Sequence, residues 1–272
     1  MNYSRYITKI FKFIRANYII SVFIAIVLFT LFIASFKVLS TEDEYIYAKI
    51  KVSQGYWWVD VPRPRRWLAQ SIQLGEKEKT LSGKPIAEIH SVRYYPYWGP
   101  DQYEIYLTVL LRVSTNEETG KYTFKRSSLG ISSPVDFEFP STFISGTVMD
   151  LSPEPFSDAY IDKVVTLEKK FAFLWEYDAI QIGDTYFDGE ETVVEILDKK
   201  TMNSYSVYSG LGNNYPVESE PTQTIVVTAR VKVQEKDGEY IFGEEQVLRA
   251  GKTMNIVTSQ FVFDQYTVSS IE

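Results

Sequence analysis

The chain contains an internal duplication, and this repeat constrains its fold more than any other feature of the sequence. Ile72–Glu76 reads Ile-Gln-Leu-Gly-Glu and returns as Ile-Gln-Ile-Gly-Asp at Ile180–Asp184, with a tryptophan, Trp67 or Trp175, five residues before each copy. Further matches follow in the same order: Tyr45–Val52 with Tyr160–Leu167, Thr108–Val113 with Thr228–Val233, Gly120–Phe124 with Gly238–Phe242, and Val148 with Val268. The offset between matched segments varies from 108 to 120 residues, as expected when loops differ in length. Two copies of one fold unit are therefore predicted.

The matches place the first copy at 45–151 and the second at 160–272. Between them Ser152–Pro155 reads Ser-Pro-Glu-Pro, a combination of turn-forming residues that is typical of a domain boundary. We therefore predict two domains, with a fragment 157–272 that folds alone.

Alternation of apolar and polar residues predicts that both copies consist of β-strands. The clearest strand-like runs, rich in β-branched and aromatic residues, are Tyr45–Val52, Glu104–Val113 and Thr224–Val233. Hairpin turns are predicted at Asn116–Gly120, Asp188-Gly189 and Asp237-Gly238. The part of the chain after residue 41 is therefore predicted to be mainly β.

A weaker, half-sized repeat within each copy begins at a glycine. The four glycines are Gly75, Gly130, Gly183 and Gly251. A glycine at the start of a strand commonly supplies the positive φ of a tight turn or bulge, and we predict this role for all four. A ligand-binding glycine loop is the alternative, but no helix N-terminus adjoins them to hold phosphate. Four such half-units predict two tandem small β-barrel-like domains.

An uncharged apolar stretch runs from Ala16 to Phe36. At about 1.5 Å per residue it is long enough to cross a hydrocarbon core of about 30 Å. We predict a transmembrane helix at 16–38; a cleaved signal sequence is the alternative, although its apolar region is usually only about 7–15 residues long. Basic residues precede the stretch and Thr41–Glu44 is acidic. The positive-inside rule then predicts a single-pass cell-membrane protein with a cytoplasmic basic segment, 1–15, and extracytoplasmic β domains.

Composition excludes several kinds of chemistry. The chain has no cysteine and one histidine, which excludes disulfides and thiolate sites and disfavours histidine-rich metal sites, so we predict no metal and no cofactor. Residues 1–40 hold five of the 28 bases and no acid, which leaves 23 bases against 35 acids, a net charge of −12, in the remainder. Such a surface repels a polyanion, so no nucleic-acid partner is predicted.

Two sets of ionisable residues have both a functional and a structural interpretation. The acidic set is Asp178, Asp184, Asp188, Glu190 and Glu191. These residues could ligate calcium, but their spacing is not that of a known calcium loop, and solvated turn residues are the favoured interpretation. His90, a lone histidine at a strand end, is interpreted as a surface residue rather than a general base. No catalytic residue is predicted.

The candidate binding residues are aromatic and basic. Tyr94–Pro100 reads Tyr-Tyr-Pro-Tyr-Trp-Gly-Pro, and its prolines predict a loop with exposed rings between two strands. The alternative is a loop that folds back to cap a barrel end. A second surface combines tryptophans with arginines and could meet lipid headgroups, an acidic wall polymer or a protein; simple packing of the tryptophans is the alternative. The candidates are Tyr94, Tyr95, Tyr97, Trp98, Trp57, Trp58, Arg65 and Arg66.

Several short motifs carry a resemblance to a known family. They are Ile180–Asp184, Thr224–Thr228, Leu248–Lys252 (Leu-Arg-Ala-Gly-Lys) and Val268–Ile271. Together with one N-terminal span, they resemble an uncharacterised bacterial membrane family, the domain-of-unknown-function family forty-three thirty. The resemblance is best over 160–272 and fainter over 45–151, and the tandem duplication departs from the family's usual single copy. It implies a bacterial single-pass protein and supplies no catalytic residues.

These observations favour a membrane-anchored extracytoplasmic β module that binds another cell-envelope component or supports an envelope assembly, without catalysis. Its predicted partners are the lipid bilayer, through 16–38, and either an envelope protein or further copies of itself. The alternative is a cell-envelope glycan hydrolase that uses paired Asp or Glu carboxylates, whose separation is a three-dimensional property.

Overall fold

The computed structural model describes residues 16–39, 44–53, 63–97, 102–115, 118–157, 159–205 and 222–272. Residue contacts divide the chain into two compact units, Met1–Glu44 and Tyr45–Glu272. Helix α2, Tyr18–Leu39, belongs to the first unit, and its large apolar side chains between Tyr18 and Ile33 are exposed. Within the described residues, no helix is both long and apolar enough to cross a membrane. The span at 16–38 and its orientation therefore stay predictions, and the basic segment 1–15 lies outside the described residues.

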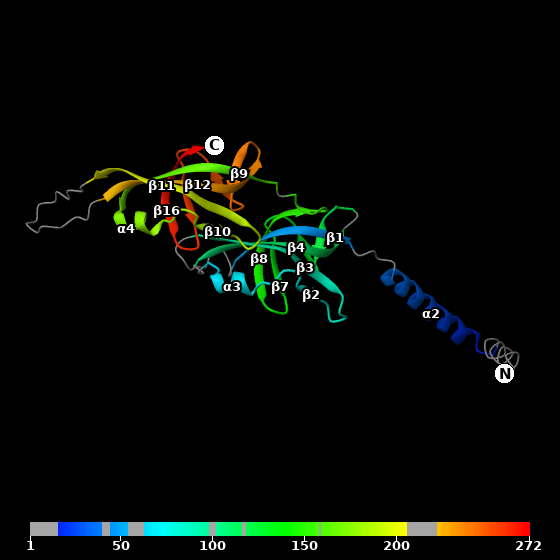
Figure 1. The fold of residues 1–272 in the computed structure, drawn as a ribbon. Helices are drawn as coiled ribbons and strands as arrows, with labels where there is room; N and C mark the ends of the chain where they lie inside the picture. The colour runs from blue at the N-terminus through cyan, green and yellow to red at the C-terminus, as the bar shows by residue number, and fades with distance from the viewer. Residues whose placement is uncertain are drawn as a thin grey trace, which may run out of the picture. The chain divides into compact units, whose positions relative to one another are not determined.

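The second unit consists of strands and two short helices (Figure 1). The first copy comprises β1 (Glu44–Val52), α3 (Arg66–Ser71), β2 (Lys77–Lys79), β3 (Pro85–Pro96), β4 (Tyr103–Thr115), β5 (Tyr122–Phe124), β6 (Ser127–Leu129), β7 (Pro134–Glu138) and β8 (Phe143–Ser152). The second comprises β9 (Tyr160–Phe173), α4 (Leu174–Ala179), β10 (Thr185–Phe187), β11 (Thr192–Tyr205), β12 (Thr222–Lys236), β13 (Glu239–Phe242), β14 (Gln246–Leu248), β15 (Thr253–Val257) and β16 (Val262–Ile271).

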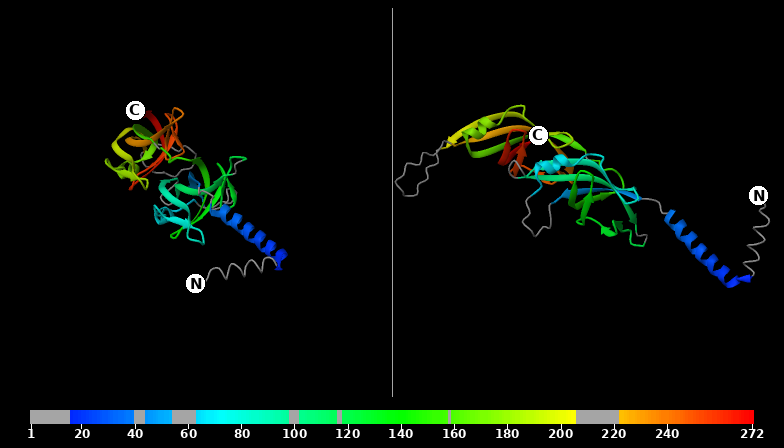
Figure 2. Two further views of the ribbon diagram at one scale, coloured as in Figure 1. Left: turned by 90° about the vertical axis from the view of Figure 1, so that its right-hand side faces the viewer. Right: turned by 90° about the horizontal axis from the view of Figure 1, so that it is seen from below.

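Both copies have the same sheet topology. The strand order of the first is β2-β3-β4-β1-β8-β7, with β5 and β6 extending from β4. The second is β10-β11-β12-β9-β16-β15, with β13 and β14 extending from β12. Each sheet is curled like half of a barrel (Figure 2). The mainly β class and the tandem repeat predicted from the sequence agree with this topology.

The register of strand pairing tests the sequence matches. Ile50 of β1 pairs with Val148 of β8, and Leu167 of β9 pairs with Val268 of β16, so Ile50 and Leu167 are equivalent. The predicted match of the two leading strands is therefore wrong by two residues. A shift of two leaves every side chain on its own face of the sheet, so alternation alone cannot detect it.

Three of the four predicted glycine turns are present. Gly75, Gly183 and Gly251 have positive φ. Gly130 does not, and the prediction for it is wrong. The first-copy counterpart of Gly251 is Ser132, with φ of 68°. The amide of Ser132 donates to the carbonyl of Val148 as the amide of Gly251 donates to that of Val268, at 2.8 and 2.7 Å.

Each curled sheet encloses its own apolar core. The core of the first copy includes Ala48, Ile50 and Ile105, all fully buried. The core of the second copy includes two residues of the first, Tyr95 and Tyr106. The second copy therefore completes its packing on the first, and a separate fragment 157–272 would lose these two aromatic rings.

Candidate binding site at the junction of the two copies

One face of the first sheet forms the contact with the second copy. On β4, Ile105 and Leu107 are buried in the core, while the residues that alternate with them point to the opposite side. Strands β3, β4 and β1 are neighbours in the sheet, so the outward side chains of all three make one patch. We call this patch the junction face: Lys49, Lys51, Arg93, Tyr95, Glu104 and Tyr106.

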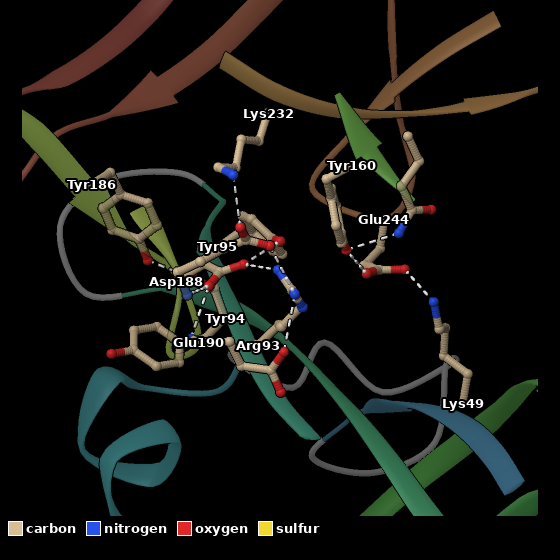
Figure 3. Close-up of polar contacts among 12 residues, drawn as sticks. Lys49, Arg93, Tyr94, Tyr95, Tyr160, Tyr186, Asp188, Glu190, Lys232 and Glu244 are labelled. Atoms are coloured by element: carbon tan, nitrogen blue, oxygen red, sulfur yellow. Dashed lines mark hydrogen bonds and ion pairs between the residues drawn. The ribbon is translucent and has the colours of Figure 1, made fainter. Parts of the chain in front are cut away.

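A buried ion pair lies at the centre of the junction (Figure 3). Nη1 of Arg93 is 2.6 Å from Oδ2 of Asp188, whose side chain is 0% exposed. The same oxygen accepts a 2.7 Å hydrogen bond from the hydroxyl of Tyr95. Nη2 of Arg93 contacts Glu190 at 2.9 Å and Glu191 at 3.1 Å. The guanidinium thus binds three carboxylates from the turn between β10 and β11.

The environment fixes the protonation of these groups. Burial disfavours the charged form of Arg93, but the Asp188 carboxylate, together with Tyr160, Tyr95 and Glu190, outweighs this effect and raises the pKa of the guanidinium. Burial, followed by the negative charge of Asp188, raises the pKa of Tyr95. Partial burial favours protonation of Glu191, but hydrogen bonds from Lys232 and Arg93 outweigh it and lower the pKa of Glu191. Arg93 therefore stays charged, and Tyr95 keeps the proton that it donates.

Asp188 is fully satisfied by local as well as distant partners. Its Oδ1 accepts the backbone amides of Glu190 and Glu191, each at 3.0 Å, as in an Asx turn. The interpretation of this acidic set as solvated turn residues is wrong for Asp188, because its charge is buried against Arg93. Among the described residues, no group of histidines and acids is placed to hold a metal ion.

A second set of ion pairs joins the turn between β13 and β14 to the junction face. Glu244 accepts from Lys49 at 2.8 Å and from the hydroxyl of Tyr160 at 2.9 Å (Figure 3). Glu245, the next residue, pairs with Lys51 and accepts a 3.1 Å hydrogen bond from the hydroxyl of Tyr106. The two acidic residues of one turn thus reach two lysines on one strand.

Glu104 belongs to the same network. Its Oε2 lies 3.2 Å from the Tyr106 hydroxyl, whose single proton is shared between Glu104 and Glu245. Its Oε1 lies 2.6 Å from Arg63 and 3.0 Å from Lys51. Two carboxylates, one from each copy, therefore share a phenol and are both ion-paired.

The backbones of the two copies also touch. The amide of Tyr94 donates to the carbonyl of Asp188 at 2.7 Å, and the hydroxyl of Tyr186 donates to the carbonyl of Tyr94 at 2.7 Å. Gly189 has φ of 114°, and a Cβ at this position would lie 2.4 Å from the carbonyl oxygen of Val92. Only glycine lets the β10–β11 turn approach β3 so closely.

A cavity of about 290 Å³ lies beside this network, with walls from both copies. Its aromatic wall consists of Tyr95 and Tyr97 from the first copy and Tyr186 and Phe242 from the second. Its polar wall includes Glu104, Glu245, Gln246 and Asn255. The volume is near the lower end of the range of small-molecule sites, about 300–1,000 Å³.

The structure brings two of the predicted binding residues into this cavity. Tyr95 and Tyr97 line it, and Tyr97 is 41% exposed. The predicted exposed loop is wrong for Tyr94 and Tyr95, which lie in β3; Tyr95 is buried and Tyr94 is half-buried against the first core. The strand extends to Pro96, because a proline at the last strand position interrupts no internal hydrogen-bond ladder.

The other predicted residues lie elsewhere. Arg65 and Arg66, at the start of α3, are exposed, and neither is among the described residues that line the cavity. His90 is exposed, with its ring edge-on to Tyr47 at 5.4 Å. Trp57, Trp58 and Trp98 lie outside the described residues.

The residues that hold the junction together were missed by sequence reasoning: Lys49, Lys51, Arg93, Glu244 and Glu245. One available signal was a difference in charge between equivalent turns. The β5–β6 turn of the first copy is Lys125-Arg126, whereas the β13–β14 turn of the second is Gly243–Glu245. A reversal of charge at one position of a duplicated fold indicates that the two copies use that position differently.

No protein-family model, curated protein or solved structure matches this chain. Fold and site define a tandem β protein with a cavity at the junction of its two copies. The resemblance of 160–272 to an uncharacterised bacterial family stays a prediction.

Proposed function

We propose that the chain is a membrane-anchored, extracytoplasmic binding module that holds another envelope component at the junction cavity. The observation that carries this proposal is that both copies contribute to the cavity wall, which includes Tyr95 and Tyr97. Tyrosine offers a large contact area with little side-chain entropy to lose, which suits a binding surface.

The ion pairs around the cavity support a structural role for the ionisable groups. A buried ion pair adds little net stability, but it specifies one arrangement of the groups that it joins, because a misplaced charge would be buried without a partner. The pair between Arg93 and Asp188 would thus hold the cavity walls in a fixed relation. A rigid wall lowers the entropy lost on binding and raises affinity.

A glycan hydrolase is the second candidate function, because Glu104 and Glu245 both line the cavity and contact the Tyr106 hydroxyl. Such an enzyme requires one carboxyl group that holds a proton for the leaving group. Both carboxylates here bind cations: Glu104 binds Arg63 and Lys51, and Glu245 binds Lys51. Binding without catalysis therefore agrees better with this wall.

A photo-crosslinking experiment tests the proposal. A benzophenone amino acid at Tyr97, in cells that make the protein natively, is expected to capture a discrete adduct that mass spectrometry identifies. Tyr45 is the matched control, because it is a tyrosine of the same 41% exposure that does not line the cavity. Equal capture at both positions, or none at Tyr97, would contradict binding at the cavity. Release of a shortened glycan by the protein would instead favour the second candidate function, a glycan hydrolase.

A further inference from the structure

We propose that the junction cavity binds a neutral sugar ring, a pyranose residue of a glycan. This inference rests on the proposed function, because it takes the cavity to be the binding site, and it assigns the class of ligand.

The aromatic wall matches the apolar side of a sugar ring. Tyr95 and Phe242 pack edge to face, with ring centroids 5.8 Å apart, and these two rings and Tyr186 are buried, so this part of the wall offers a ligand only small areas of ring. The guanidinium of Arg63 lies 3.3 Å from the ring centroid of Tyr97 and covers one face of that ring. Tyr97 lines the cavity and is 41% exposed, so part of this side chain can meet a ligand. Aromatic rings present broad apolar surfaces, and one side of a pyranose carries mainly C–H groups.

The polar wall matches the hydroxyl groups of a sugar. Gln246 and Asn255 each carry an amide that both donates and accepts hydrogen bonds, and the carboxylates of Glu104 and Glu245 accept them. A hydroxyl group can donate to one of these groups and accept from another. Pockets of this kind use a few polar groups to orient a ligand whose apolar surface supplies most of the contact.

The balance of charge distinguishes a neutral ligand from an ionic one. The two acids of the wall, Glu104 and Glu245, are neutralised by Lys51 and Arg63. An organic cation would find aromatic rings but carboxylates that are already paired, and an anion would meet the same two carboxylates. A ligand without charge avoids both costs, and its hydroxyl groups can hydrogen-bond to the lone pairs and amide groups of the polar wall that internal contacts leave over.

The cavity also depends on the difference between the two copies. Gly243, with φ of 60°, lies in the β13–β14 turn against the Tyr95 ring. The approach is close, since a Cβ added at this glycine would lie 3.3 Å from two ring atoms. The equivalent turn of the first copy, Lys125-Arg126, is one residue shorter and basic. The sugar site therefore belongs to the duplicated protein and to neither copy alone.

Saturation-transfer NMR on the full chain, in a polyoxyethylene detergent free of sugar, tests the assignment. The probes are the methyl pyranosides of glucose, galactose, mannose and N-acetylglucosamine. We expect transfer to the ring protons of at least one pyranoside, and Tyr97→Ala to weaken its binding at least about tenfold. Tyr97→Phe keeps the ring and is expected to retain binding, and Tyr45→Ala serves as the matched surface control.

Choline and glucuronate are the charged probes. Stronger binding of either one than of every pyranoside, with the same dependence on Tyr97, would overturn the assignment of a neutral ligand. Absence of pyranoside binding would overturn it as well. If crosslinking at Tyr97 still captured a protein in that case, the proposed binding function would stand and the sugar assignment alone would fail. Sugar binding that Tyr97→Ala leaves unchanged would place the sugar outside this cavity.

Discussion

Replacement of Asp188 by alanine is expected to destabilise the second compact unit, Tyr45–Glu272, by about 4 kcal/mol, because loss of one partner of a buried ion pair leaves the other charge without compensation. Of its three carboxylate partners, the guanidinium of Arg93 would keep only Glu190 and Glu191, which are partly exposed. The Tyr95 hydroxyl would lose its acceptor, Asp188 Oδ2. For a unit of this size the change corresponds to a decrease of about 10 °C in Tm. Urea unfolding and thermal denaturation of the full chain measure it.

The matched control is Glu190→Gln. Glu190 binds the same guanidinium at 2.9 Å, but its side chain is 32% exposed, so water can replace the contact. We expect a loss of less than about 1 kcal/mol. The double variant Arg93→Met with Asp188→Leu removes both charges and is expected to recover part of the stability. Equal losses for Asp188→Ala and Glu190→Gln would contradict a dominant role for the buried pair.

The fold was predictable where its signals are local. Alternation over Glu104–Val113 places core residues on one face of β4, and the paired motifs at Gly75 and Gly183 mark equivalent turns. The pairing of Ile50 with Val148 was not predictable to better than two residues, because alternation repeats every two residues. The curl of the sheets and the packing of one copy on the other depend on contacts distant in sequence.

The site was predictable only in part, and for the same reason. Tyr97 follows a proline that ends a strand, so local sequence identified it as a surface ring. Asp188 precedes a glycine, and an Asp-Gly pair is equally typical of a solvated turn. What buries Asp188 is Arg93, which lies 95 residues earlier in the chain. No periodic pattern within either copy records a contact between copies.

The charge reversal at equivalent turns gives the duplication a physical consequence. Two identical copies would bring the same turn, with the same charge, to every equivalent surface. Glu244 and Glu245 pair with Lys49 and Lys51 from a turn that is acidic where the equivalent turn of the first copy carries Lys125-Arg126. The difference in charge between these equivalent turns thus allows the two copies to form the ion pairs beside their shared cavity.

Replacement of Gly189 by alanine tests how closely the copies must approach. The new Cβ would lie 2.4 Å from the carbonyl oxygen of Val92 and 2.9 Å from Cε1 of Tyr94. Backbone strain at positive φ of about 1–2 kcal/mol adds to an overpacking penalty of about 1–3 kcal/mol. We therefore expect a loss of about 3 kcal/mol in the free energy of unfolding, measured by urea denaturation of the full chain.

Gly238→Ala separates the contact from the backbone strain. Gly238 also has positive φ, 79°, but an added Cβ would meet no atom within 4 Å, so only the strain, about 1 kcal/mol, is expected. Equal losses for the two variants would mean that the close contact between Gly189 and Val92 does not determine the loss of stability.

A turn pushed away from β3 would also separate Tyr186 from the Tyr94 carbonyl and thus open the aromatic wall. Crosslinking at Tyr97 should therefore weaken in Gly189→Ala and persist in Gly238→Ala, because only the first variant changes the junction between the copies.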